Sequence, residues 1–326
     1  MMSVLQSNPA DYSSADSADP EALECEIFAI PGDCAGLRLD AALAQMFPEH
    51  SRSRLQGWIK EGLIQLDGAS ADAKRKVWGG ETICMEAPPL PGDSCHRAES
   101  IDFPRVYEDD ALMVIDKPAG LVVHPGSGNW SGTLLNALLH YLPQLEAVPR
   151  AGIVHRLDKD TSGLMVVAKT LQAQTELVRQ LQARSVKRHY LALVHGVVAS
   201  DGRVDAPIGR HPVQRIKMAV VASGREARTH YLVRQRFAAA TLVECRLETG
   251  RTHQIRVHMA SIGHPLVGDP VYGKARCGDA RLDAFPRQAL HAWRLVLIHP
   301  VTREEMAWES SLPADFVNLL EEVARG

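Results

Sequence analysis

The first patterned part of the chain alternates apolar and polar residues in a way that predicts two helices followed by a hairpin. Apolar side chains recur at intervals of three and four residues over 37–47 and again over 52–60, as in helices that are buried on one side. A short alternating strand then enters a tight turn at Asp67-Gly68, and a further strand follows at 82–85. This pattern predicts a compact helix-helix-hairpin module.

A longer part of the chain alternates between strand-like and helix-like spacing. Apolar runs predict strands at 111–115, 120–124, 190–194, 242–247 and 290–300. Helical spacing predicts helices at 133–141, 171–184, 313–323 and from His253 onward, the last capped by Thr252. The irregular, basic stretch 200–230 is expected to form exposed loops or a hairpin. The pattern predicts one large α+β domain.

Two unpatterned stretches set the expected domain boundaries. Residues 1–35 contain seven acidic and no basic residues, so we expect an acidic disordered tail. Residues 86–104 begin with a Pro-Pro-x-Pro core and are expected to form an extended, stiff linker. The module therefore spans 36–85 and the large domain spans 105–326.

Composition narrows the class of protein. The 326 residues are 45% hydrophobic, no apolar run is long enough to cross a membrane, and no secretory signal pattern is present, so the cytoplasm is expected. The net charge of the chain is −3. Outside the tail the chain has 36 basic and 39 − 7 = 32 acidic residues, so that part carries a net charge of +4. A nucleic-acid partner would then be bound by local basic clusters. The six cysteines show no zinc-ligand spacing, so we expect reduced thiols and no metal.

The stretch 152–169 gathers polar side chains into a loop between two apolar runs, 153–154 and 164–168. Its composition predicts strand, loop and strand, and locally it favours ordinary turns formed by the polar residues. A loop fixed between strands can also present a reactive group. Asp158 is the candidate for that group.

The string His155-Arg-Leu-Asp158-Lys-Asp-Thr-Ser-Gly163 resembles the signature of the RluA-type pseudouridine synthases, which isomerise uridine in RNA to its C-glycoside. The resemblance implies that Asp158 is the nucleophile that acts on a flipped-out base. It also implies that Arg156 fills the space that the base leaves. Tyr190, from an Arg-x-Tyr strand, is expected to stack on the base. Arg256 is expected to pair with Asp158 and keep it ionised.

Other segments extend the resemblance over residues 36–320. Asp116-Lys-Pro followed by Val-His124-Pro matches the family's opening pattern, with Asp116 in place of the usual Asn. The segment that contains Arg251 and Arg256 matches a second family motif, and Leu290 begins a strand that lines the pocket in relatives. His253 and His258 are five residues apart and do not share a helix face, so polar and structural roles are preferred for them over metal binding.

The module at 36–85 resembles an S4 RNA-binding domain. Basic residues gain affinity for nucleic acid by releasing its counterions, so those of the module and a few of the large domain are the expected RNA contacts. Solvated surface positions are the plain alternative. The candidates are Arg52, Arg54, Lys60, Lys74, Arg75, Lys76, His124, Arg156 and Arg251.

Taken together, the resemblance implies an S4-like domain followed by a catalytic domain with a mixed, largely antiparallel sheet and a central cleft. It implies a monomeric enzyme without cofactor that modifies large-subunit (23S) ribosomal RNA or a pre-ribosomal 50S particle, at a stem-loop of the subunit interface. Three alternatives stay open: an RNA-binding assembly factor without catalysis, a synthase acting on another RNA such as tRNA, and a glycosidic-bond hydrolase using Asp158 and Asp160.

Overall fold

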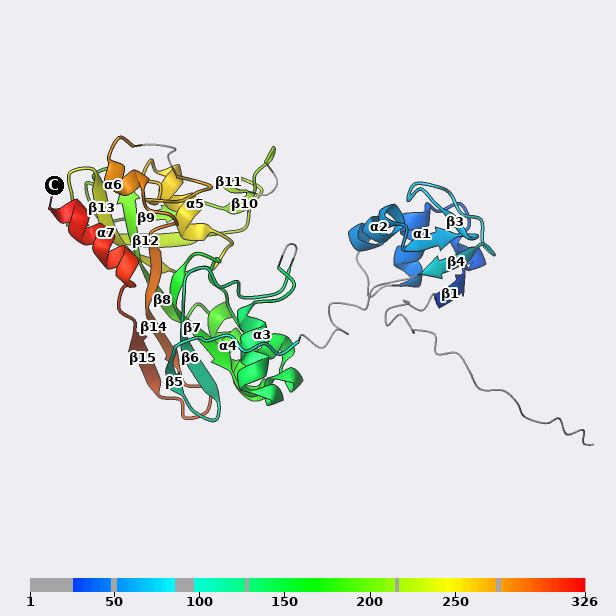
Figure 1. Ribbon diagram of the computed structural model, residues 1–326, viewed down its shortest axis with the longest axis horizontal. Helices are drawn as coiled ribbons and strands as arrows, with labels where there is room; N and C mark the ends of the chain where they lie inside the picture. Colours follow the sequence, from blue (N-terminus) through cyan, green and yellow to red (C-terminus); the bar gives the residue numbers. More distant parts are fainter. Residues whose placement is uncertain are drawn as a thin grey trace, which may run out of the picture. The chain divides into compact units, whose positions relative to one another are not determined.

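The computed structural model describes residues 26–47, 52–85, 97–126, 129–214, 217–273 and 277–325 (Figure 1). The chain forms two compact units, which divide between Ser94 and Cys95. The stretch 1–25, for which we predicted disorder, and residues 86–96 of the predicted linker lie outside the described residues.

The first unit packs two helices on a small antiparallel sheet. The helices are α1 (Leu39–Met46) and α2 (Arg52–Glu61), and in the described part of the unit four strands form the sheet in the order β1-β4-β2-β3. The strands are β1 (Glu26–Ala29), β2 (Ile64–Leu66), β3 (Ala69–Ser70) and β4 (Thr82–Met85). Apolar residues from both helices and the sheet form one core. Asp67 and Gly68 both have positive φ, as the predicted tight turn requires.

Two predictions for this unit are wrong. Residues 26–35 do not belong to a disordered tail, because β1 pairs with β4 and Ile30 is buried in the core. The acidic composition of the segment concealed a short strand that completes the sheet. Cys84 is not a reduced thiol, because it is disulfide-bonded. Cysteine spacing alone does not reveal which thiols the fold brings together.

The second unit is built on a mixed sheet. Among its described residues nine strands form the sheet, in the order β5-β6-β7-β14-β8-β13-β12-β9 with β15 against β14. Only the β7–β14 pairing in this path is parallel. The strands are β5 (Arg105–Glu108), β6 (Leu112–Lys117), β7 (Ser162–Ala168), β8 (Lys187–His195), β9 (Gly202–Asp205), β12 (Arg228–Arg236), β13 (Ala240–Leu247), β14 (Leu290–Ile298) and β15 (Glu305–Glu309); β10 (Ile208–Arg210) and β11 (Met218–Val220) form a separate hairpin.

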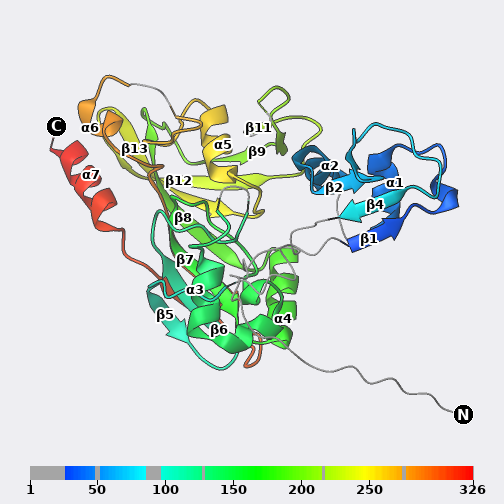
Figure 2. The same ribbon diagram turned by 45° about the vertical axis from the view of Figure 1, so that its right-hand side comes forward.

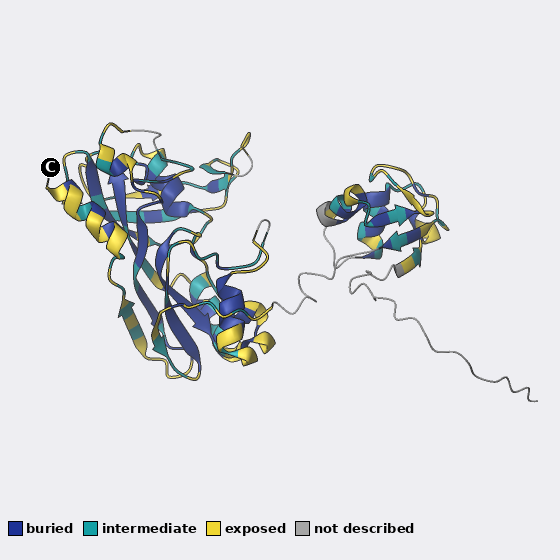
Figure 3. Ribbon diagram, in the orientation of Figure 1, coloured by how far each residue is buried: buried dark blue, intermediate teal, exposed yellow. Residues whose placement is uncertain are grey.

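Helices cover both faces of this sheet (Figure 2). One face carries α3 (Leu134–Tyr141) and α5 (Gln254–Ser261), which share a core with β6, β7, β8 and β13. The other face carries α4 (Leu171–Gln182), α6 (Ala280–Asp283) and α7 (Ala314–Ala324). Buried residues are concentrated in the central strands, whereas α7 shows an exposed outer side (Figure 3). The loop of the 152–169 stretch packs on the α3–α5 face through Leu157.

Several boundaries of the large domain differ from the predicted ones. Residues 97–104 are packed rather than linker-like: the Asn136 side chain donates to the Arg97 carbonyl, and Phe103 is buried. The stretch 200–230 contains a hairpin, β10 and β11, as one of the two expected forms, but β9 and the start of β12 within it belong to the main sheet. Residues 120–124 form no strand but only a single bridge at Val122. Thr252 does not cap α5; the N-cap is His253, in the left-handed conformation.

Candidate active site

Two glycines fix both ends of the loop that carries Asp158. A Cβ on Gly152 would lie 1.8 Å from the Ala168 carbonyl oxygen, and one on Gly163 would lie 2.3 Å from that of Ala292. Both glycines also have positive φ. The loop therefore enters and leaves through two points of close backbone contact. The predicted first strand is only a bridge between Ile153 and Val167.

Two buried basic side chains bind backbone carbonyls of this loop. The Lys117 ammonium is fully buried and donates to the carbonyls of Pro118, Leu121 and Lys159 at 2.8–2.9 Å. Burial lowers the pKa of Lys117 to about 7, opposed by the nearby carboxylates of the loop. Arg287 donates to the carbonyl of Asp160, the next residue along the loop, at 3.1 Å. Consecutive loop carbonyls are thus bound from two different elements.

Asp158 and Arg256 meet as predicted, and a third residue orients them. Arg256 donates its Nη1 proton to Asp158 Oδ2 at 2.9 Å. The remaining edge of the guanidinium binds Asp269 in bidentate fashion, through Nε at 2.7 Å and Nη2 at 2.9 Å. Asp269 holds the Nε and Nη2 side of the guanidinium, so the remaining Nη1 points at Asp158. No hydrogen bond from the described residues reaches the other oxygen of Asp158, Oδ1, and 21% of that side chain is exposed.

The charges of this cluster support one another. Burial alone would lower the pKa of Arg256, but the carboxylates of Asp269 and Asp158 raise it above its ordinary value. The pKa of Asp269 is lowered: burial opposes this, and Arg256 together with two backbone N–H groups outweighs it. The Arg256 guanidinium also lies over the ring of Tyr272, 5.2 Å from its centroid. Arg256 is therefore a permanent cation beside Asp158.

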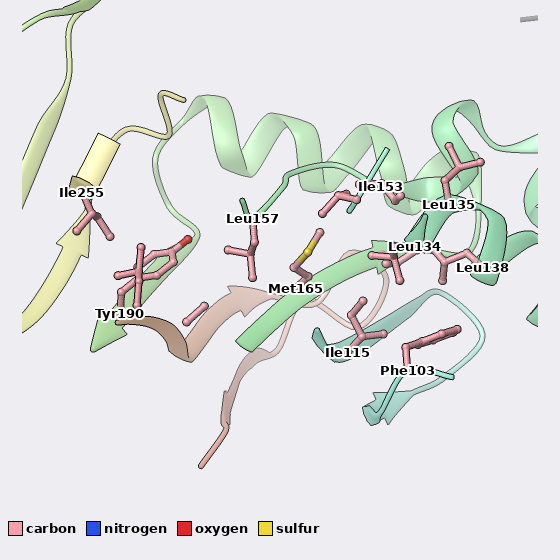
Figure 4. Packing of buried hydrophobic residues seen from close by; sticks show 14 of the residues in the cluster. Phe103, Ile115, Leu134, Leu135, Leu138, Ile153, Leu157, Met165, Tyr190 and Ile255 are labelled. Carbon is pink, nitrogen blue, oxygen red and sulfur yellow. The ribbon is translucent and has the colours of Figure 1, made fainter. Parts of the chain in front are cut away.

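Tyr190 lies in the same core cluster as Leu290, Leu157 and Ile255. Figure 4 shows Tyr190, Leu157 and Ile255 as neighbours, contributed by β8, the loop and α5. Burial raises the pKa of Tyr190, with Arg188 acting against and Asp158 in favour of the rise. The phenol is therefore neutral, and the ring forms an apolar wall near Asp158.

The predicted RNA contacts fall into different environments. Lys60, Lys74, Arg75, Lys76 and Arg156 are exposed, and His124 and Arg251 are partly exposed. Arg52 donates to the buried carboxylate of Asp40 at 2.8 Å, so part of its charge is used within the first unit. The side chain of Arg54 lies outside the described residues.

Sequence reasoning missed several residues of the site. Asp269 and Tyr272 lie in a segment that the resemblance covered, but without a role, and nothing local links them to Arg256. Arg188 precedes Tyr190 by two residues on the same strand, and the sequence motif assigns it no role. Its buried Nε has no hydrogen-bond partner among the described residues, and a Cβ on Gly250 would come within 2.7 Å of its Nη1. His253, for which polar and structural roles are expected rather than metal binding, lies beside Asp158.

Comparison with known proteins identifies the family of this chain. The sequence matches the family model for RNA pseudouridylate synthase over residues 111–261 and the S4 domain over 37–83. A protein named ribosomal large subunit pseudouridine synthase D from Nitrosomonas europaea is 61% identical over 297 residues, covering 90% of this chain and 86% of the relative. The chain belongs to the RNA pseudouridine synthase family. A relative of the same name from Pseudomonas aeruginosa is 57% identical, covering 89% of this chain and 93% of its own.

Solved structures of pseudouridine synthases share the fold. Human RNA pseudouridylate synthase domain containing 4 superimposes with a TM-score of 0.55 at 28% identity, covering 68% of this chain and 92% of the human chain. Human RNA pseudouridylate synthase domain containing 1 superimposes with a TM-score of 0.54 at 27% identity, covering 66% of this chain and 86% of the human chain. The predicted fold class and the predicted activity, an RNA pseudouridine synthase with an S4 domain, are confirmed.

Family membership also separates the alternatives. It assigns the chain to an enzyme family rather than to non-catalytic assembly factors, and to uridine isomerisation rather than glycosidic hydrolysis.

The described residues contain no cluster of side chains that could hold a metal ion. Among the described helices, none has both the length and the apolar character that a membrane crossing requires.

Proposed function

We propose that this synthase isomerises uridines of large-subunit ribosomal RNA, with Asp158 as the nucleophile acting on a flipped-out base. The names of the relatives support this RNA as the substrate and favour it over tRNA. The observation that carries the catalytic assignment is the two-sided environment of the Asp158 carboxylate. Arg256 binds Oδ2, and among the described residues no donor lies within hydrogen-bonding distance of Oδ1.

This environment suits the chemistry of the reaction. The N1–C1′ bond of uridine breaks, a C5–C1′ bond forms, C5 releases a proton and N1 gains one. No electrons are gained or lost, so the reaction needs an anionic nucleophile and a site that retains the detached ring. Arg256 holds Oδ2 in place, and the uncovered Oδ1 is free to approach the sugar or the ring.

The neighbours of Asp158 fit the handling of the base. Tyr190 and Leu290 offer an aromatic and an aliphatic surface for the flipped ring. Arg156 is exposed two residues before Asp158, where its guanidinium can occupy the gap left in the RNA stack. The buried Nε of Arg188 has no hydrogen-bond partner among the described residues, and an RNA phosphate is the partner that we propose for this guanidinium.

The first unit would add affinity through its exposed basic cluster, Lys74, Arg75 and Lys76. We also propose the finer features of the assignment: a stem-loop at the subunit interface as the target, free RNA or a pre-ribosomal 50S particle as the substrate form, a monomeric enzyme, and the cytoplasm as its location.

Release of tritium from C5-labelled uridine in a large-subunit rRNA transcript tests the proposal. Asp158→Asn should abolish release while RNA affinity, measured by filter binding, changes little. Asp160→Asn is the matched control, because Asp160 is an acid of the same loop whose structural contact to Arg287 uses the backbone carbonyl. Full release by the Asp158 variant, or equal loss in both variants, would overturn the assignment.

A further inference from the structure

His253 occupies an unusual backbone position at the edge of the site. It is the N-cap of α5 with φ 56° and ψ 24°, in the left-handed region that non-glycine residues seldom adopt. Strained residues of this kind persist where the surrounding structure fixes them, and they concentrate at functional sites. The conformation directs the imidazole toward Asp158, with Nε2 3.8 Å from Oδ1, the oxygen that Arg256 does not bind.

The hydrogen bonds around Tyr272 determine which imidazole nitrogen carries the proton. The Tyr272 hydroxyl oxygen accepts a hydrogen bond from the backbone N–H of Met218 at 2.9 Å. The same oxygen lies 2.9 Å from His253 Nδ1. Since burial raises the pKa of Tyr272, the hydroxyl keeps its proton, and Nδ1 is the acceptor within its reach among the described residues. With Nδ1 accepting, a neutral imidazole has its proton on Nε2.

The imidazole is held in its neutral form. Burial lowers the pKa of His253; the cations Arg256 and Arg156 act in the same direction, against Asp158 and Asp269. A charged imidazolium would pair with Asp158 and tie up its second oxygen. A neutral Nε2–H leaves Oδ1 reactive and presents a donor beside it.

We propose that His253 is a further active-site residue whose Nε2–H donates a hydrogen bond to the reacting uridine next to Asp158 Oδ1. The inference rests on the proposed function of Asp158 as nucleophile. Whether Asp158 attacks the sugar, attacks the ring or removes a sugar proton, negative charge develops on the ring when the N1–C1′ electron pair leaves with it. A fixed neutral donor stabilises such charge without having to reorient. Tyr272 is the positioning residue, because it acts through His253.

Two substitutions of His253 distinguish the effect of losing the Nε2–H donor from the effect of disturbing the backbone. Gln can place an N–H at the distance of Nε2, whereas the side chain of Asn ends at the distance of Nδ1. Asn also tolerates left-handed backbone better than most residues, so His253→Asn should fold. We expect His253→Asn to lower kcat about 100-fold with little change in RNA affinity, and His253→Gln to recover most of that loss.

Nitrogen NMR of the imidazole provides a readout that does not depend on catalysis. The wild-type protein should show the Nε2–H tautomer of His253, and Tyr272→Phe should shift the population toward Nδ1–H and reduce kcat in part. A wild-type Nδ1–H tautomer, an unchanged kcat in His253→Asn, or an equal loss in the Gln and Asn variants would each overturn the proposal. If Asp158→Asn retained activity, the proposed function itself would fail; a dead Asp158 variant beside a fully active His253→Asn would overturn this inference alone.

Discussion

Asp269→Asn tests whether a buried ion pair fixes Arg256 in the orientation that contacts Asp158. The Asp269 carboxylate is fully buried and accepts hydrogen bonds from two guanidinium nitrogens of Arg256 and from the backbone N–H groups of Val271 and Tyr272. Asn keeps one acceptor oxygen, but its amide N–H group would face the donors of Arg256. The substitution changes few atoms and removes the charge that positions the guanidinium.

The expected cost follows from the burial of the pair. Removing one partner of a buried ion pair costs about 3–5 kcal/mol, because the other charge stays in place without compensation. Only 5% of the Arg256 side chain is exposed, and Asp158 remains as a second partner. We therefore expect a loss at the lower end, about 3 kcal/mol, in the unfolding free energy of the second unit. A misplaced Arg256 should also lower kcat about 100-fold.

Hydrogen exchange of peptides from β8 and β13 reports the stability of the second unit alone, and tritium release reports kcat. Arg256→Met combined with Asp269→Asn removes both charges, so this double variant should be more stable than Asp269→Asn while staying inactive. The reasoning would be refuted if Asp269→Asn left exchange and kcat at wild-type values, or if the double variant were the least stable of the set.

Three further predictions concern the loop and the RNA surface. The pKa of Lys117 is about 7 in the folded protein and 10.5 ordinarily. Between these pH values the unfolded chain binds one more proton at Lys117 than the folded chain does. The contribution of Lys117 to the free energy of unfolding therefore rises with pH in this range, by roughly 1.4 kcal/mol per pH unit. In urea unfolding, the free energy of unfolding of the wild type minus that of Lys117→Met should increase from pH 7 to pH 9. A difference that stays constant over this range would contradict the prediction. Gly163→Ala should lower Tm more than Gly263→Ala, because both glycines have positive φ but only Gly263 has open space for a Cβ. Equal decreases in Tm would show that the close contact at Gly163 does not contribute to stability. Replacing residues 74–76 by Gln should reduce the salt dependence of rRNA binding, with a log–log slope smaller by about 2–3; an unchanged slope would exclude the cluster as an RNA contact.

Local sequence patterns predicted most elements of the fold. The helices α1, α2, α3 and α4 and the strand β4 lie close to their predicted positions, because their apolar spacing and turn residues agree with the final packing. The strand β1 was missed, since four residues in an acidic context carry little signal of their own. The disulfide at Cys84 was missed for a related reason: pairing depends on proximity in the fold.

Sequence motifs supplied three residues of the candidate site, and their catalytic roles stay predictions. Asp158, Tyr190 and Arg256 come from three separated motifs, and the pairing of Asp158 with Arg256 is found in the structure. Asp269 and His253 acquire their positions only through contacts made after folding. Neither the bidentate pairing of Asp269 nor the left-handed backbone of His253 leaves a periodic trace in the sequence.

Pseudouridine mapping of large-subunit rRNA in cells gives the most direct test of the central claim. The chromosomal copy would be replaced by one encoding Asp158→Asn, with Asp160→Asn as the control strain. We predict that the Asp158 strain lacks the same discrete set of pseudouridines as a strain without the protein, while the control strain retains them. A complete set in the Asp158 strain would contradict the assignment of Asp158 as the nucleophile, and an unchanged map in the strain without the protein would contradict large-subunit rRNA as the substrate.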